Sequence, residues 1–378
     1  MSVKRVVAGL GVAALVTALI AWRLSHAPDH ASAASPPSGS TASPSAPLTP
    51  SGRTAAAPAM PPARVAPYPE LGEPGLAKDD PLTAYRKANV YPPTSHPLTA
   101  EHVDLLHPNQ RHEQPRATDA DDGVEYLFTA DRYFVFGDEP LAITLDVRHD
   151  GRPQPVTVIQ AFAAQSDHRL PDPPRTPFVL RGTGPLTATL APAAMGLTTQ
   201  ATIGLYVEFA YGDTRQRAHV DFSYTPAAGV PARFTGAFED RVESGSLVVH
   251  AGIAVAVAGR YVIDCNLYDA SDRPVAWTRA KVRLATGTRD VALAFFGKVL
   301  VDQHVEGRFH IGELRGARFD PGRDPDLEQM PPFAGTFTTA AYPRSAFSDA
   351  EYDSPEKQRM IQFLSDQQER GVHQGPAR

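Results

Sequence analysis

The most regular signal along the chain is an alternation of apolar and polar side chains with a period of two. Four runs show it most clearly, at residues 141–147, 203–209, 261–267 and 291–295. This period is typical of strands that bury one face, and turn-forming sequences separate the runs. No long helical period intervenes between them. The pattern therefore predicts an all-β, antiparallel fold.

The length of this region predicts how it divides into domains. Residues 123–347 number about 225, enough for two sandwiches of roughly 100 residues each. A break rich in Pro, Gly and Ala at residues 225–231 interrupts the strands on both sides. We therefore expect two tandem β-sandwich domains, at residues 123–228 and 229–347.

Residues 1–26 follow another pattern, because an uncharged apolar run at residues 6–22 comes directly after Lys4 and Arg5. At about 1.5 Å per residue this run reaches some 25 Å, near the lower limit for crossing a membrane. It is either an uncleaved signal anchor or a signal peptide cleaved near residues 31–33, and the charges in between favour the anchor. The basic residues before it predict that the rest of the chain is exported, to the periplasm or outside the cell.

The next segments are rich in proline. Residues 27–70 consist mainly of Pro, Ala, Ser, Thr and Gly, so they are expected to form a disordered linker. Residues 71–122 regain apolar side chains and are expected to form an irregular arm that lies along the first sandwich. One short helix is predicted there, from about Thr99 to His107, with Thr99 as its N-cap.

The C-terminal segment, residues 348–378, carries a strong helix start. Ser354 is a suitable N-cap, and Pro355 suits the first helical position. We expect a helix to about Arg370, ended by Gly371. Its apolar side chains, Met360, Ile361, Phe363 and Leu364, predict either packing on the second sandwich or docking of a partner.

Part of the second sandwich resembles a known class of module. The residues that carry the resemblance are 259–270, which end in the turn Tyr268-Asp269-Ala270, and 274–276, 308–311 and 339–342. They look like the immunoglobulin-like modules of many exported bacterial proteins. The whole chain is similar to an exported bacterial family of unknown function built from tandem modules of this kind. The resemblance implies a fold and brings no catalytic residues.

Candidate chemistry is sparse. The chain has no His-Glu-x-x-His, Gly-x-Ser-x-Gly, phosphate-binding glycine loop or paired-cysteine metal site. Its single cysteine, Cys265, occupies an alternating position and is expected to be a core residue, and a lone cysteine forms no disulfide within the chain. With 42 acidic and 36 basic side chains, nucleic acid is not expected as a partner.

Two groups of side chains raise the question of a metal ion. Histidines gather in the arm, beside several carboxylates, where zinc or copper is a possible ligand; they are His96, His102, His107 and His112. Carboxylates gather at two loops that calcium would suit; they are Asp119, Asp121 and Asp122, and Asp320, Asp324 and Asp326. For both groups the alternative is a solvated surface, and no cofactor is otherwise expected.

Aromatic side chains give a candidate binding surface. A cluster opens the first sandwich, and one tryptophan lies in the second; they are Tyr126, Phe128, Tyr133, Phe134, Phe136 and Trp277. Exposed aromatic platforms on sandwiches bind sugars or peptides, whereas burial under the arm would explain the same residues structurally.

These observations favour a membrane-tethered, exported, non-enzymatic binding or structural protein that acts through protein–protein contacts. One alternative is a carbohydrate or cell-wall binding module, which predicts an exposed strip of coplanar aromatic rings. A second is a metal-dependent hydrolase that uses the arm from His96 to His112. A third is an accessory subunit of an exported enzyme or secretion machine, which exposed apolar surface on the C-terminal helix would favour. The expected partner is an envelope protein or a glycan.

Overall fold

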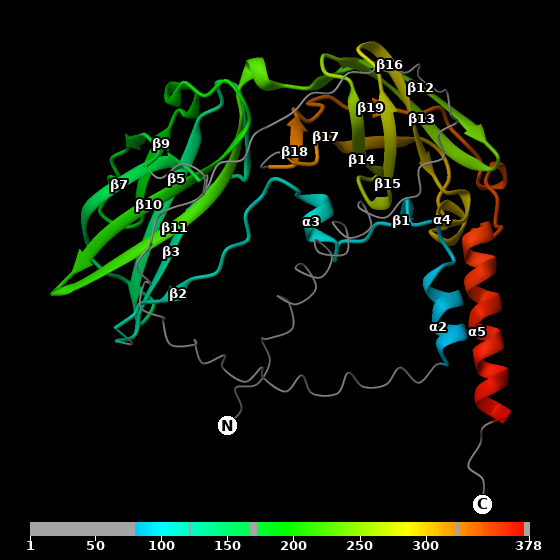
Figure 1. Cartoon of the computed structure of the whole chain (residues 1–378), viewed down its shortest axis with the longest axis horizontal. Helices are drawn as coiled ribbons and strands as arrows, with labels where there is room; N and C mark the ends of the chain where they lie inside the picture. The colour runs from blue at the N-terminus through cyan, green and yellow to red at the C-terminus, as the bar shows by residue number, and fades with distance from the viewer. Residues whose placement is uncertain (1–79, 121, 167–171, 323–324, 374–378) are drawn as a thin grey trace, which may run out of the picture. The chain divides into compact units, whose positions relative to one another are not determined.

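A computed structural model describes residues 80–120, 122–166, 172–322 and 325–373, and all of them belong to one compact unit, Gly72–Arg378 (Figure 1). The predicted anchor at 1–26 and linker at 27–70 lie outside the described residues. Within the described ranges, no helix combines the length and the apolar character that a membrane span needs.

β-Strands make up about half of the described residues, and helices a much smaller part. The helices are α2 (Pro81–Ala88), α3 (Val103–Leu106), α4 (Gly297–Asp302) and α5 (Pro355–His373). The strands before the predicted domain break are β1 (Ser95–Pro97), β2 (Arg116–Ala117), β3 (Val124–Ala130), β4 (Phe134–Phe136), β5 (Leu141–His149), β6 (Arg152–Pro153), β7 (Thr157–Gln165), β8 (Arg175–Pro177), β9 (Leu186–Leu190), β10 (Ala201–Tyr211) and β11 (Thr214–Thr225). Those after it are β12 (Ala232–Glu243), β13 (Ser246–Val255), β14 (Gly259–Asp269), β15 (Pro274–Leu284), β16 (Gly287–Phe295), β17 (Phe309–Phe319), β18 (Leu327–Met330) and β19 (Phe337–Thr338).

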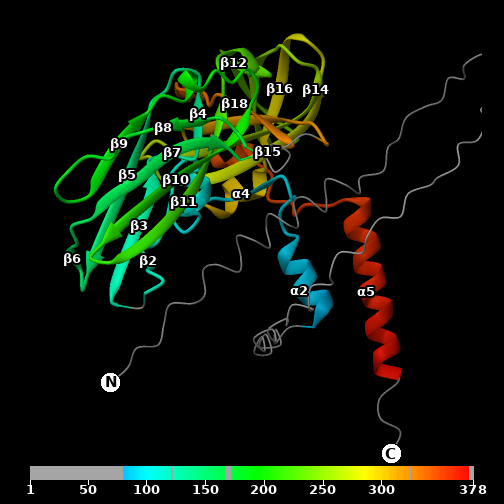
Figure 2. The same cartoon turned by 60° about the vertical axis from the view of Figure 1, so that its left-hand side comes forward.

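The first sandwich packs two sheets around one buried cluster (Figure 2). Their strand orders are β4-β11-β10-β7-β8 and β2-β3-β5-β6, with β9 also paired to β5. The alternation seen in the sequence places the apolar side chains of each strand on the inward face. Four of these side chains are at most 1% exposed, namely Ile143 and Leu145 of β5 and Leu205 and Phe209 of β10. Burying each such side chain contributes about 1.5–3 kcal/mol.

The second sandwich repeats this arrangement with its own buried cluster. One sheet has the order β1-β15-β14-β17-β18, with β19 paired to β17, and the other has the order β12-β13-β16. Ile263, Cys265 and Leu267 of β14 are fully buried, as their alternation predicts. The two clusters fall within residues 124–224 and 232–347. The domain limits given above stay predictions.

The arm differs from its prediction, because it pairs with both sandwiches rather than lying along the first. β1 adds to β15 of the second sandwich, and β2 pairs with β3 of the first. Leu98 follows β1, is fully buried, and donates its N–H to the carbonyl of Val275 at 3.0 Å. The arm's only predicted helix is shorter than expected: α3 starts at Val103, with His102 rather than Thr99 as N-cap.

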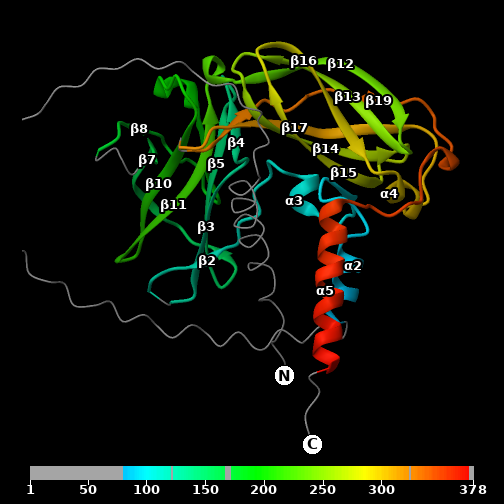
Figure 3. The same cartoon turned by 45° about the vertical axis from the view of Figure 1, so that its right-hand side comes forward.

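The helices α2 and α5 pack against each other (Figure 3). The start of α5 is confirmed, since the Ser354 hydroxyl accepts a hydrogen bond from the Lys357 N–H at 3.1 Å. Its predicted end was wrong, because the helix continues through Gly371 to His373. The sequence analysis also expected α5 to pack on the second sandwich or to dock a partner, but the element that α5 mainly contacts is α2. The sequence analysis did not predict the helix α2.

Candidate functional site

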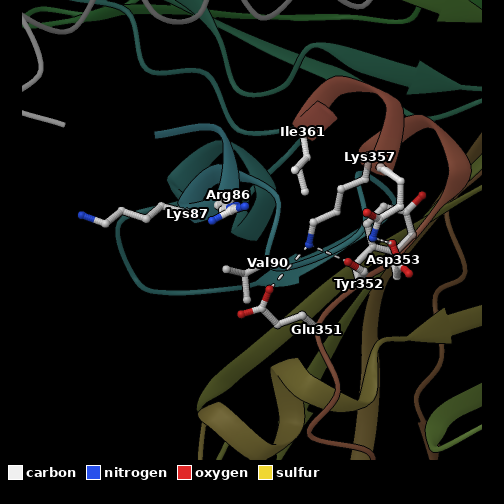
Figure 4. Close-up of a pocket in the computed structure, with 9 residues that line it drawn as sticks. Arg86, Lys87, Val90, Glu351, Tyr352, Asp353, Lys357 and Ile361 are labelled. Atoms are coloured by element: carbon white, nitrogen blue, oxygen red, sulfur yellow. Dashed lines mark hydrogen bonds and ion pairs between the residues drawn. The ribbon is translucent and has the colours of Figure 1, made fainter. Parts of the chain in front are cut away.

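The helix pair encloses a groove of about 400 Å³ (Figure 4). Residues of α2, of the turn after it, and of the start of α5 line this groove; they are Arg86, Lys87, Val90, Glu351, Tyr352, Asp353, Lys357, Gln358 and Ile361. α2 begins at an Asp80 N-cap, whose carboxylate accepts hydrogen bonds from the N–H groups of Leu82 and Thr83.

Lys357 fixes the groove in place. Its side chain is only 7% exposed, and its Nζ donates to the carbonyl oxygens of Asn89 at 2.8 Å and Tyr352 at 2.6 Å. The same nitrogen lies 3.6 Å from a carboxylate oxygen of Glu351 (Figure 4). Because all three partners hold the ammonium group, Lys357 fastens the first turn of α5 to the residues that follow α2.

Outside the lining of this groove, α5 exposes two large apolar side chains. Met360 is 42% and Phe363 is 54% exposed. At about 1.5 Å per residue, the eight residues of α2 span about 12 Å and the nineteen of α5 about 28 Å. Less than half of α5 therefore has α2 beside it.

A second candidate surface lies on the outer face of the first sandwich. Three rings stand directly opposite one another on neighbouring strands: Phe162 on β7, Tyr206 on β10 and His219 on β11. The ring centres of Phe162 and Tyr206 are 5.1 Å apart at an interplanar angle of 18°, and those of Tyr206 and His219 are 4.8 Å apart at 26°. Near-parallel planes at these distances are offset stacks, so each ring overlaps only part of the next.

Polar side chains form the neighbouring row on the same face. Glu208 stands opposite Gln160 and Arg217, and its Oε2 accepts hydrogen bonds from Gln160 Nε2 at 3.0 Å and Arg217 Nε at 3.2 Å. Its side chain is only 10% exposed, whereas that of Arg217 is 81% exposed. The carboxylate therefore organises the row, while the arginine remains available to a ligand.

These rows border a groove of about 490 Å³. Its lining residues are Arg116, Tyr126, Gln160, Phe162, Arg175, Tyr206, Val207, Glu208, Arg217, Ala218 and His219. Three arginines and a single carboxylate belong to this lining, so the lining carries a net positive formal charge although the chain carries a net charge of −6, and Asp221 lies beside it, 3.0 Å from His219. The Arg175 guanidinium lies over the Phe162 ring, 4.7 Å from its centre.

The predicted histidine cluster of the arm does not come together. His96 stacks on Trp277 with ring centres 5.6 Å apart, and burial there lowers its pKa, with a smaller contribution from the charge of His102. The His102 Nδ1 accepts a hydrogen bond from the Thr99 N–H at 3.1 Å. His107 and His112 are exposed. Among the described residues, no group of three or more His, Cys, Asp or Glu side chains is arranged to hold a metal ion.

The first acidic cluster is engaged in local hydrogen bonds. Loss of water works to raise the pKa of Asp122, but hydrogen bonds from the Val124 N–H, the Thr118 hydroxyl and the Tyr211 hydroxyl hold it below its usual value. Asp119 lies 3.3 Å from the Gln216 amide nitrogen. Asp121 lies outside the described residues.

The second acidic cluster is held by an arginine. Arg318 donates to Glu328 at 2.6 Å and to Asp320 at 2.8 Å. The Asp320 N–H donates to the carbonyl of Asp326, which closes the loop. Asp324 lies outside the described residues. The described carboxylates therefore serve the loop itself.

The predicted aromatic surface needs correction, because most of its members are structural. Phe128 and Phe136 are buried, at 5% and 9% exposure, and Phe128 belongs to the core cluster of the first sandwich. Tyr126 packs edge-on against Phe209 and is also one of the residues that line the groove of the first sandwich, whereas Tyr133, 37% exposed, packs against Phe134.

Trp277 is half-buried and stacks on His96, so its neighbour in the structure is the arm. Cys265 is a core residue as predicted: it is fully buried, and burial raises the pKa of its thiol.

The sequence analysis missed the ring row of Phe162, Tyr206 and His219. One signal was present, because Tyr206 is an aromatic residue at a polar phase of the alternation from Ile203 to Phe209. Its meaning depends on the register of three strands, which places the two other rings beside it.

No protein-family model matches the chain, and no curated protein sequence matches it. Among solved structures, it is similar to a DUF4785 family protein from Legionella pneumophila, with a TM-score of 0.42 and 16% identity over 60% of this chain and 59% of the other. The chain thus matches less than two thirds of that protein's length.

Two further solved structures are similar over parts of the chain. A DUF4426 family protein from Pseudomonas aeruginosa has a TM-score of 0.22 and 12% identity over 30% of this chain and 98% of the other. The FN1–FN3 domains of chicken CNTN1 have a TM-score of 0.21 and 13% identity, over 61% of this chain and 66% of the other.

Proposed function

We propose that this chain is an exported, membrane-tethered, non-enzymatic protein of tandem immunoglobulin-like sandwiches that binds another envelope protein through helix α5. Residues 6–22 would supply the membrane contact and residues 27–70 the spacing. The observation that carries the proposal is the exposure of Met360 and Phe363 on α5, two large apolar side chains that the contact with α2 leaves uncovered.

The occupant that fits best is an amphipathic helix of the partner protein. α2 already packs on α5 as a short helix, and Ile361, half-buried, belongs to the groove between them. The apolar side chains of α5 continue past this contact to Leu364, which is also half-buried. A helix in line with α2 would therefore extend an interface that the chain itself makes, through anchors spaced three to four residues apart.

The test is site-specific photo-crosslinking of the full chain in intact cells. A photoreactive amino acid replaces Phe363, whose exposure makes the substitution mild. The matched control replaces Val257, which is 42% exposed on the second sandwich. We expect a protein adduct at position 363 and none at position 257, with the crosslinked peptide, identified by mass spectrometry, coming from an amphipathic segment.

Two results would overturn the proposal. One is equal crosslinking, or none, at positions 363 and 257. The other is an adduct with the mass of two copies of this chain, which would assign α5 to self-association instead. Adding Met360→Ser to the position-363 variant should lower the yield of a specific adduct, because it removes the adjacent apolar contact.

A further inference from the structure

The outer face of the first sandwich joins an apolar row and a polar row in one groove. The three-ring row and the Glu208 row lie two residues apart along β7, β10 and β11, and both line the same hollow. We propose that this groove binds an acidic saccharide.

The ring row supplies the apolar part of such a site. A Cβ atom added at Gly204 would lie 2.6 Å from the Tyr206 ring, which means that the tyrosine leans over the glycine along the sheet. Phe162 and Tyr206 are half-buried and His219 is exposed. Because each ring covers part of the next, the row presents ring edges and partly covered ring faces, which together form an apolar strip for the C–H groups of a pyranose ring.

The polar row supplies hydrogen-bonding groups for hydroxyls. Glu208 occupies one amide hydrogen of Gln160 and the Nε–H of Arg217. The Gln160 carbonyl oxygen and the terminal nitrogens of Arg217 have no hydrogen-bond partner among the described residues. These planar groups accept from and donate to adjacent hydroxyls of one sugar ring.

The charge of the groove selects an acid. Arg116 is exposed and has no ion pair or hydrogen-bonded side-chain partner in the described part of the chain. Arg175 lies over Phe162, and its contact with Asp172 is long, at 3.9 Å. A carboxylate on the ligand would form charge-assisted hydrogen bonds with these guanidinium groups, in the two-pronged geometry that arginine favours.

The position of the groove favours a saccharide over a peptide. Tyr206 and Glu208 belong to β10, which is hydrogen-bonded to β7 on one side and β11 on the other. A peptide therefore cannot extend the sheet there by adding a strand, and side-chain stacking and charge must supply the affinity.

The test is titration calorimetry of the full-length chain at low salt with hexagalacturonate and with its methyl-esterified, neutral form. We expect the acid to bind and the ester to bind at least roughly tenfold more weakly, since each charge-assisted pair is worth about a factor of ten. Arg116→Ala should weaken binding of the acid by about the same factor.

Control variants on the second sandwich distinguish binding at the groove from an effect of overall charge or of losing any tyrosine. Arg283→Ala removes the same charge from an exposed residue of β15 and should leave binding unchanged. Tyr206→Leu should weaken binding roughly tenfold by removing one stacking ring. Tyr268→Leu removes a tyrosine that also leans over a glycine, Gly312, and should have no effect on binding.

Three outcomes would overturn the proposal. The first is no heat of binding with hexagalacturonate, and the second is equal affinity for its neutral ester. The third is a loss with Arg283→Ala as large as that with Arg116→Ala, which would mean attraction to overall charge. Hexaglutamate that binds as tightly as hexagalacturonate would reassign the groove to acidic peptides.

Discussion

The two sandwiches carry the same local arrangement on the outer face of one sheet, but only one of them leaves it open. In the first, Tyr206 stacks on His219 with ring centres 4.8 Å apart. In the second, Tyr268 stacks on His310 at 5.3 Å. Each tyrosine leans over a glycine on its own sheet. The stacked rings of the two sheets therefore do not decide which outer face stays open.

The arm makes the difference. On the second sandwich, Asn266 is 1% exposed and donates its amide N–H to the carbonyl of Leu105 at 2.7 Å, and the His96 ring stacks on Trp277. The corresponding row of the first sandwich borders an open groove. A short segment of irregular chain can thus turn a potential binding face into interior.

The largest effect on stability is expected for a variant that tests whether the arm is part of the second sandwich. Leu98→Ala should lower the free energy of unfolding by about 2–5 kcal/mol, because Leu98 is fully buried. It should also speed the reaction of Cys265 with a thiol reagent under native conditions, since that buried thiol reports opening of the second sandwich. Urea unfolding and the labelling rate measure the two effects.

The control for that variant lies on the first sandwich. Val179 is 66% exposed, so Val179→Ala should change stability by less than about 0.5 kcal/mol and leave the Cys265 labelling rate unchanged. Equal behaviour of the Leu98 and Val179 variants would show that the arm is not integral to the second sandwich.

An intermediate effect on stability is expected when Gly204 and Gly312, the glycines under the two tyrosines, are each replaced by alanine. Gly312→Ala should cost about 1–3 kcal/mol, because the new Cβ would lie 2.8 Å from the Tyr268 ring, whose hydroxyl is tied to Asn266 at 3.3 Å. Gly204→Ala should cost less than about 1 kcal/mol, since the Tyr206 ring can swing into the open groove and alanine suits a strand better than glycine. Thermal unfolding of both variants measures the difference, and a larger cost at Gly204 would contradict the comparison.

The smallest effect is a pH dependence of the second sandwich. Hydrogen bonds with Asp290 and then Glu243, at 2.6 and 3.0 Å, raise the pKa of His250. The protonated form of His250 therefore stabilises the folded state. This contribution is fully present below the pKa of histidine in the unfolded chain, about 6.5, and it is lost as the pH rises through the higher pKa of His250 in the folded chain.

Melting temperatures from about pH 6 to about pH 9 should reveal this loss in the wild-type chain. His250→Gln should flatten the dependence, and Asp290→Asn should reduce it, because it removes the largest cause of the raised pKa. An unchanged slope in His250→Gln would assign the pH dependence to other groups.

The sequence was sufficient to predict individual strands and helix starts, but not which distant side chains lie next to one another. Alternation at Leu141 and at Tyr261 identified β5 and β14, because each signal is contained within one strand. The start of α2 at Asp80 and Pro81 followed the same capping rule as α5, but the proline-rich surroundings concealed it. The ring row required strand register, and the stack of His96 on Trp277 required a contact between distant segments. Neither is encoded in a local period.

The pairing of the arm has a consequence for the order of folding. Thr278 donates its hydroxyl to the carbonyl of Thr94, 184 residues earlier in the chain, and Lys357 reaches Asn89 across 268 residues. Contacts of such long sequence separation form slowly. During synthesis β1 therefore has no pairing partner until β15 has been made, and α5, later still in the sequence, adds contacts that hold the segment after α2.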